Sequence, residues 1–99
     1  MLIVAGRVAV KPERRADAVR MALDVASATR EEAGCISYRF YADLEDPNVF
    51  LIFEEWQDAA ALSRHFEMPH MTTFMQEMPS LVAGGADFKR YDVAGVEPM

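Results

Sequence analysis

Four segments of the chain are rich in apolar residues and predict β-strands: residues 2–10, 35–42, 49–56 and 86–93. The third segment has two apolar faces, because successive side chains of a strand point to opposite sides. One face carries Val49, Leu51 and Phe53, and the other carries Phe50, Ile52, Glu54 and Trp56. A strand that is apolar on both faces is typical of a sheet covered on both sides.

The segment between the first two strands predicts a helix. Pro12 suits its first turn, and Gly34 suits the position just past its end. An apolar stripe at steps of three and four residues consists of Ala16, Val19, Leu23 and Ala26.

The third strand is followed by a predicted helix pair. Asp58 is a suitable N-cap for a helix over residues 59–67, whose inward stripe carries Leu62, His65 and Phe66. Pro69 begins a second helical segment that we expect to run to about Met78 and to stop at Pro79. Gly84 and Gly85 predict a loop before the last strand.

The predicted order is strand, helix, strand, strand, helix pair, strand. This is the split βαβ order of the ferredoxin-like α+β fold, a four-stranded antiparallel sheet with helices on one face. We expect one domain over residues 1–93 and a loose tail over residues 94–99. The second sheet face is left bare, and its pairing with the same face of a second copy predicts a two-fold homodimer.

Composition and charge narrow the possible partners. The net charge of −6 argues against nucleic acid, because phosphate binding needs a clustered basic face. The single cysteine, Cys35, excludes an internal disulfide and fits a reducing cytoplasm. No apolar run approaches the ~20 residues of a membrane span, and Arg7 interrupts the apolar start too early for a signal peptide.

Several short motifs, taken in order, resemble one known family. They are Val4-Ala5-Gly6-Arg7, Lys11-Pro12, Gly34-Cys35 with Tyr38, Asp46-Pro47-Asn48, Glu54-x-Trp56 and His65-Phe66-x-x-Pro69-His70. The set resembles the antibiotic biosynthesis monooxygenase (ABM) domain family of dimeric α+β barrels, and within it the small quinol-monooxygenase-like members. The resemblance covers residues 2–92.

The resemblance implies a homodimer whose two sheets pack face to face, with a cavity in each subunit between sheet and helices. It implies oxidation of a hydroquinone, anthrone or similar polyphenol by molecular oxygen, without flavin, haem or metal. The deprotonated substrate itself gives an electron to oxygen. The protein then stabilises the anion and shields the radical pair from water.

The family also contains haem-degrading members, and this chain departs from their pattern. Those members carry asparagine, tryptophan and a haem-ligating histidine at the positions of Gly6, His65 and Met75. Other members process a phosphorylated signal or catalyse isomerisation. The rival interpretations are therefore an oxygen-independent isomerase or signal-processing enzyme, and a quinone-binding or stress-response protein without turnover.

The candidate catalytic residues are His65, as the base for a phenolic proton, and Glu54, which we expect to orient it. The residues expected to contact substrate are Tyr38, Phe40, Trp56, His70, Met71 and Phe74. Each also has a structural interpretation: His65 as a hydrogen-bonded core histidine, Glu54 in a structural ion pair, and the aromatic and methionine residues as ordinary core. A metal bound by His65, His70 and Glu54 is not expected, because residues five apart on one helix are rotated by ~140°, unless a bend at Pro69 brings the two histidines together.

Overall fold

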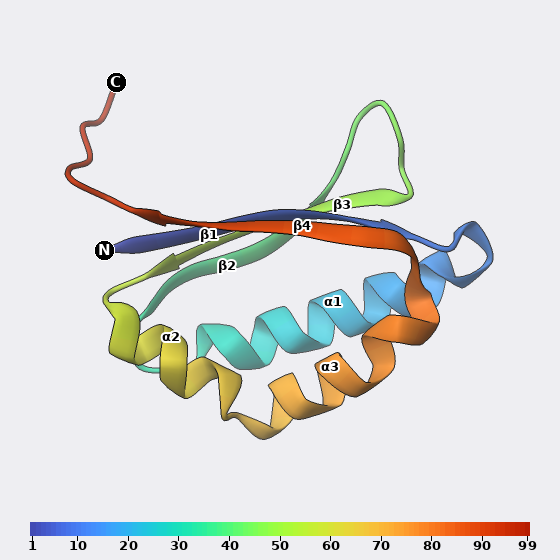
Figure 1. Ribbon diagram of the computed structural model, residues 1–99, viewed down its shortest axis with the longest axis horizontal. Coiled ribbons are helices and arrows are strands. Elements are labelled where there is room, and N and C mark those ends of the chain that lie inside the picture. Colours follow the sequence, from blue (N-terminus) through green and yellow to red (C-terminus); the bar gives the residue numbers. More distant parts are fainter.

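The computed structural model describes residues 1–99 as one sheet layer and one helix layer (Figure 1). The strands are β1 (Leu2–Val10), β2 (Cys35–Ala42), β3 (Val49–Trp56) and β4 (Val82–Asp92). The helices are α1 (Arg15–Arg30), α2 (Ala59–Phe66) and α3 (Pro69–Leu81), and a short 3-10 helix, η1 (Pro12–Arg14), precedes α1. This confirms the predicted ferredoxin-like α+β fold.

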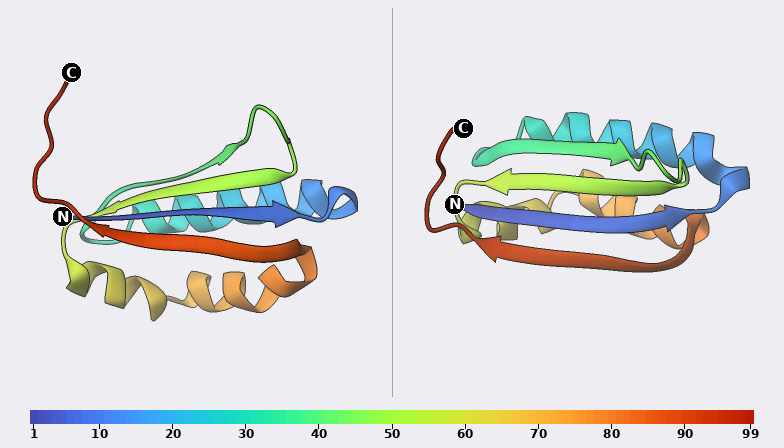
Figure 2. Two further views of the ribbon diagram at one scale, coloured as in Figure 1. Left: turned by 45° about the horizontal axis from the view of Figure 1, so that its top comes forward. Right: turned by 90° about the horizontal axis from the view of Figure 1, so that it is seen from above.

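The sheet is antiparallel throughout, in the order β2-β3-β1-β4. Figure 2 shows the four strands side by side with the helices behind them. The register pairs Tyr38 with Glu54 across β2 and β3, and Val4 with the same Glu54 across β3 and β1. Because side chains alternate along each strand, all three point to the helix side of the sheet.

The core between sheet and helices has two parts. One cluster surrounds the fully buried Trp56 and includes Tyr38, Ile52 and Leu62. The other surrounds Phe50 and Leu81 at the opposite end of the sheet.

The second face of the sheet has no helix over it. In Figure 1 the helices lie below the sheet, and only the β2–β3 turn and the C-terminal tail rise above it. This face carries the large apolar side chains Leu51, Tyr41 and Tyr91, which are 38%, 50% and 48% exposed. The predicted bare apolar face is therefore present.

The predicted stripe of α1 was wrong in part. Leu23 is 63% exposed, and the buried face instead carries Ala18, Ala22, Val25, Ala26 and Thr29. Small residues on this face let the helix lie close to the sheet, and the long Leu23 side chain is left outside.

Two predicted boundaries near the C-terminus were also wrong. The helix α3 continues past Pro79 to Leu81, whose side chain is buried and whose carbonyl accepts a 2.8 Å hydrogen bond from the Lys11 N–H. Gly84 and Gly85 lie inside β4 rather than in a loop, at the irregularity where the pairing with β1 shifts between Val8 and Val10. Glycine suits such a bulge because it has no side chain to place.

The chain ends in an irregular segment after Asp92, drawn as a strand-free tail in Figure 1. None of the helices is long and apolar enough to cross a membrane.

Candidate active site

A cavity of about 210 Å³ lies between the two core clusters, on the helix side of the sheet. We call it the chamber. Eleven of its 13 lining residues are hydrophobic, and the two that carry ionisable groups for acid–base chemistry near neutral pH are Glu54 and His65. The full lining is Val4, Val8, Tyr38, Phe40, Ile52, Glu54, His65, Phe66, Met71, Phe74, Met75, Met78 and Phe88. An apolar hollow with a few convergent polar groups is the usual form of a small-molecule site.

The mouth of the chamber is apolar. Phe66 from α2, Met75 from α3 and Phe88 from β4 are 60%, 59% and 49% exposed. Phe66 was predicted to lie on the inward stripe of its helix, and it lies instead at this rim.

His65 is held among aromatic rings. Its side chain is 1% exposed, and its ring centroid lies 4.8 Å from that of Trp56 and 5.4 Å from that of Tyr38. Burial lowers the pKa of His65, and the hydrogen bond and charge of Glu32 oppose that effect. The imidazole is therefore favoured in its neutral form, which is the form that can accept a proton.

The carboxylate partner of His65 is Glu32. Its Oε2 atom lies 2.8 Å from Nδ1 of His65 and 2.6 Å from Nε2 of His70. The Glu32 side chain is 5% exposed, and its other oxygen, Oε1, is buried without a hydrogen-bond partner. One carboxylate oxygen thus joins two imidazoles.

This contact fixes the tautomer of His65. A carboxylate oxygen is an acceptor, so the neutral imidazole must carry its proton on Nδ1 and donate it to Glu32. Nε2 is then the unprotonated nitrogen. His65 lines the chamber, and the carboxylate behind it raises the basicity of its free nitrogen.

The expectation that Glu54 orients His65 was wrong. Glu54 Oε1 instead accepts the indole N–H of Trp56 at 2.8 Å. Burial raises the pKa of Glu54 to about 7, with Glu32 adding to the rise and the Trp56 hydrogen bond opposing it. Glu54 is thus a carboxyl that holds its proton to near neutrality beside the chamber.

Tyr38 is a neutral phenol in this site. Its side chain is buried, and burial followed by the charges of Glu54 and Glu32 raises the pKa of Tyr38 well above its usual range. A phenol that keeps its proton can donate a hydrogen bond to an anionic oxygen.

Sequence reasoning missed Glu32. Its one signal was the position of an acidic residue just past the end of α1, where the helix dipole disfavours negative charge. Gly34 follows with φ of 86°, and this turn carries the chain from the helix into β2. An acidic residue at an unfavourable helix end is a reason to look for a buried cationic or hydrogen-bonding partner.

The break between α2 and α3 brings the two histidines together. His65 lies in the last turn of α2 and His70 in the first turn of α3, and their ring centroids are 6.1 Å apart. The ~140° rotation expected for one continuous helix does not apply, because the helix ends at Phe66 and begins again at Pro69.

Glu32, His65 and His70 are also the residues with metal-ligating geometry, since their ligand atoms all lie within 4.8 Å of one another. The distances of 2.8 and 2.6 Å are those of hydrogen bonds. Ligands about 2.1 Å from a tetrahedral metal would be roughly 3.4 Å apart. The cluster is therefore arranged as a hydrogen-bonded unit.

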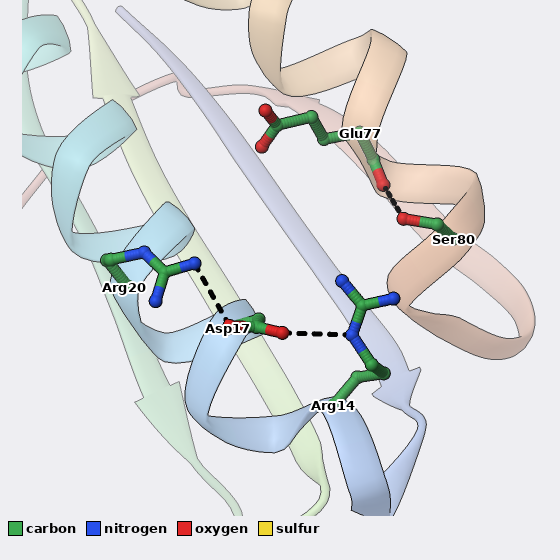
Figure 3. A network of polar contacts seen from close by, with 5 residues as sticks. All are labelled: Arg14, Asp17, Arg20, Glu77 and Ser80. Atoms are coloured by element: carbon green, nitrogen blue, oxygen red, sulfur yellow. Dashed lines mark hydrogen bonds and ion pairs between the residues drawn. The ribbon is translucent and has the colours of Figure 1, made fainter.

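His70 faces a second hollow, which we call the outer groove. This groove of about 340 Å³ lies between α1 and α3, and its lining is Arg20, Met21, Asp24, Val25, His70, Thr73, Phe74 and Glu77. Figure 3 shows two of these lining residues, Arg20 and Glu77, with polar neighbours. Arg14 and Arg20 each donate a hydrogen bond to Asp17, at 2.9 and 3.0 Å. Phe74 lines both the chamber and the outer groove and so forms part of the wall between them.

The structure brings most of the predicted substrate-contacting residues to the chamber. Tyr38, Phe40, Met71 and Phe74 line it together with His65 and Glu54. Trp56 is fully buried behind them and His70 lies on the outer groove, so neither lines the chamber.

Comparison with known proteins places this geometry in a family. The profile of the family described as "Antibiotic biosynthesis monooxygenase" (ABM) matches residues 1–77. The chain belongs to the ABM family. It is 28% identical to a putative antibiotic biosynthesis monooxygenase from Deinococcus radiodurans of known structure, with a TM-score of 0.93 over 100% of this chain and 98% of that one.

Two curated relatives of this ABM protein are similar over nearly its whole length. An uncharacterized protein of Synechocystis sp., sll1783, is 37% identical over 99% of this chain and 67% of its own length. The "Putative monooxygenase YcnE" of Bacillus subtilis is 27% identical over 95% of this chain and 99% of its own length. The predicted resemblance is thus confirmed at the level of the family.

Proposed function

We propose that this ABM protein oxidises a single-ring hydroquinone with molecular oxygen and needs no bound cofactor. The substrate phenol loses its proton to the protein, and the resulting anion gives an electron to oxygen. The semiquinone and superoxide then combine, and water leaves. Hydroquinone and one O₂ thus yield a hydroxyquinone and one H₂O, with one oxygen atom entering the ring.

The observation that carries this proposal is the hydrogen bond between Nδ1 of His65 and Glu32, at 2.8 Å. It leaves Nε2 of a buried, neutral imidazole as the base of a mostly apolar chamber, whose other ionisable lining residue is Glu54. Burial holds the pKa of His65 below its ordinary value, so the ring is neutral and can accept the phenolic proton.

Two further side chains suit the developing anion. Tyr38 keeps its proton and can donate a hydrogen bond to the phenolate oxygen. Glu54, with its pKa raised to about 7, is neutral often enough to avoid repelling the anion and, when protonated, is a second donor. The apolar walls exclude water from the radical pair.

The size of the chamber favours a substrate with one aromatic ring over a substrate with three fused rings. An apolar cavity of about 150 Å³ holds benzene, and the chamber measures about 210 Å³. Among the expected substrates, a hydroquinone with small substituents fits this volume better than an anthrone.

The proposal includes a homodimer in the cytoplasm. Its support is the uncovered sheet face with Leu51, Tyr41 and Tyr91, since a second copy is the simplest cover for a self-complementary apolar face. The single Cys35 is compatible with a reducing compartment.

The test is product analysis by mass spectrometry, with and without oxygen, on metal-stripped protein and a panel of hydroquinones. The proposal predicts a product with one oxygen added and two hydrogens removed, formed only in air and faster than by autoxidation. Turnover under nitrogen would identify an isomerase or signal-processing enzyme. Quinone binding without turnover would identify a binding protein.

A further inference from the structure

His65 and His70 share one carboxylate oxygen but face different surroundings. His65 is 1% exposed and lines the chamber, whereas His70 is 23% exposed and lines the outer groove. Oε2 of Glu32 lies within hydrogen-bond distance of both rings, at 2.8 and 2.6 Å. We propose that Glu32 couples the two imidazoles, so that a proton taken by His65 in the chamber is balanced by a proton released from His70 to solvent.

The charges of the cluster support this exchange. One carboxylate balances one imidazolium, and two imidazoliums on a single buried oxygen would repel each other. Of the two rings, His70 is the more exposed and therefore the one on which water better solvates a positive charge. With the charge on that ring, Glu32 accepts Nε2–H of His70 and Nδ1–H of the neutral His65.

In this exchange the cluster gains one proton and loses one, and no proton is transferred through Glu32. The substrate O–H bond breaks and an N–H bond forms at Nε2 of His65, while the N–H bond at Nδ1 of His70 breaks and its proton goes to water. The net charge of the cluster is unchanged. When the oxidation ends, His65 gives its proton to the departing oxygen and His70 takes one back from solvent.

Other ionisable groups surround the two rings on every side. Around His65 they are Tyr38 on β2 and Glu54 on β3, with Cys35 also near Glu32. Around His70 they are Arg20 and Asp24 on α1 and Glu77 on α3. None of these makes a hydrogen bond to either imidazole, so the shared Glu32 oxygen is the direct link.

His70 therefore acts through Glu32 as a charge-balancing residue. This role rests on the proposed function for its catalytic meaning, since His65 gains a positive charge during the oxidation and the proton released from His70 offsets it. The coupling itself is a property of the resting protein and is measurable without substrate.

The first experiment is a ¹⁵N NMR titration of the imidazole nitrogens in the whole protein. The coupling predicts a neutral His65 with its proton on Nδ1, and a rise of roughly one unit or more in the apparent pKa of His65 in His70→Asn. Glu32→Gln lowers the pKa of His65 instead. Glu31→Gln is the matched control, because it removes the same charge from the adjacent, exposed position and leaves His65 unchanged.

The second experiment measures turnover of a hydroquinone by His70→Asn as a function of pH. We expect kcat near neutral pH to fall by roughly tenfold with KM little changed and to recover at higher pH, because the raised pKa of His65 keeps this base protonated until the pH is higher. A purely structural His70 leaves the pH profile of kcat in place.

The outcomes separate the two proposals. Independent titration of His65 and His70, or equal shifts in His70→Asn and Glu31→Gln, would overturn the coupling even if oxidation is found. Coupled titration with no oxidation of any hydroquinone would support the coupling and overturn the proposed function.

Discussion

The Nδ1 atom of His65 lies 2.8 Å from Oε2 of Glu32, a residue 33 positions earlier in the chain. Glu32 follows the end of α1, and His65 lies in the last turn of α2. The turn after α1 and the break between α2 and α3 thus meet at one buried carboxylate. The contribution of this contact to the free energy of unfolding can be measured.

Replacing Glu32 with alanine should destabilise the protein by roughly 2–4 kcal/mol. The reason is that His65 and His70 both lose their acceptor, and a buried donor without a partner costs about 1–3 kcal/mol. Urea unfolding at pH 7 measures the change. Glu31→Ala is the control, and an equal loss in both variants would mean that the cluster contributes nothing to the fold.

Glu54→Gln should change how stability depends on pH. The unfolded carboxyl has a pKa of 4.5 and the folded one about 7. Between these values the folded state binds more protons than the unfolded state, so the contribution of Glu54 to stability falls as pH rises from about 4.5 to about 7 and is constant above that. The penalty for the buried charge at pH 8 is about 3 kcal/mol.

Glutamine keeps an oxygen acceptor for the Trp56 indole and cannot ionise. We therefore expect Glu54→Gln to match the wild type near pH 4.5 and to exceed it in unfolding free energy at pH 8. Denaturant unfolding of both proteins at the two pH values measures this difference in unfolding free energy. A constant difference between them would show that Glu54 does not titrate in this range.

Gly6 and Phe88 should be energetically coupled. They pair across β1 and β4, and the Phe88 ring occupies the space that a Cβ atom at Gly6 would take. Gly6→Ala should cost about 1–3 kcal/mol, because the ring must move from the chamber wall. In a Phe88→Ala background the same substitution should cost nothing, and full additivity in this double-mutant cycle would contradict the contact.

Leu51→Lys should produce a monomer at micromolar concentration if the bare sheet face is the dimer interface. Leu51 lies on that face in β3, whereas Leu44 is fully exposed in the β2–β3 turn. Leu44→Lys adds the same charge and should remain dimeric. Light scattering after size exclusion gives the masses of both variants. A dimeric Leu51→Lys would show that the dimer interface does not lie on this sheet face.

The fold was predictable because its signals are local. The alternation in residues 49–56 and the stripe with Leu62 and His65 each follow from neighbouring residues, and the strands and helices appear where these patterns place them. The chamber lining followed from the same periodicity, since Tyr38 and Glu54 are on the helix side by alternation.

The predictions that were wrong concern features that depend on contacts between residues far apart in the sequence. Pro79 does not end α3, because Leu81 is held by burial and by a hydrogen bond from the N–H of Lys11, a residue 70 positions earlier in the chain. The partner of His65 was misassigned to Glu54 because no local pattern places Glu32 beside His65. Only the tertiary arrangement of the two helix ends brings them together.

The role of His65 as the base is measured by the rate of oxygen consumption of metal-stripped protein with its best hydroquinone, compared between the wild type and His65→Gln. We expect uptake well above autoxidation in the wild type and a fall of about 10² or more in the variant, because the buried base is lost. Equal uptake by His65→Gln would show that this imidazole does not deprotonate the substrate.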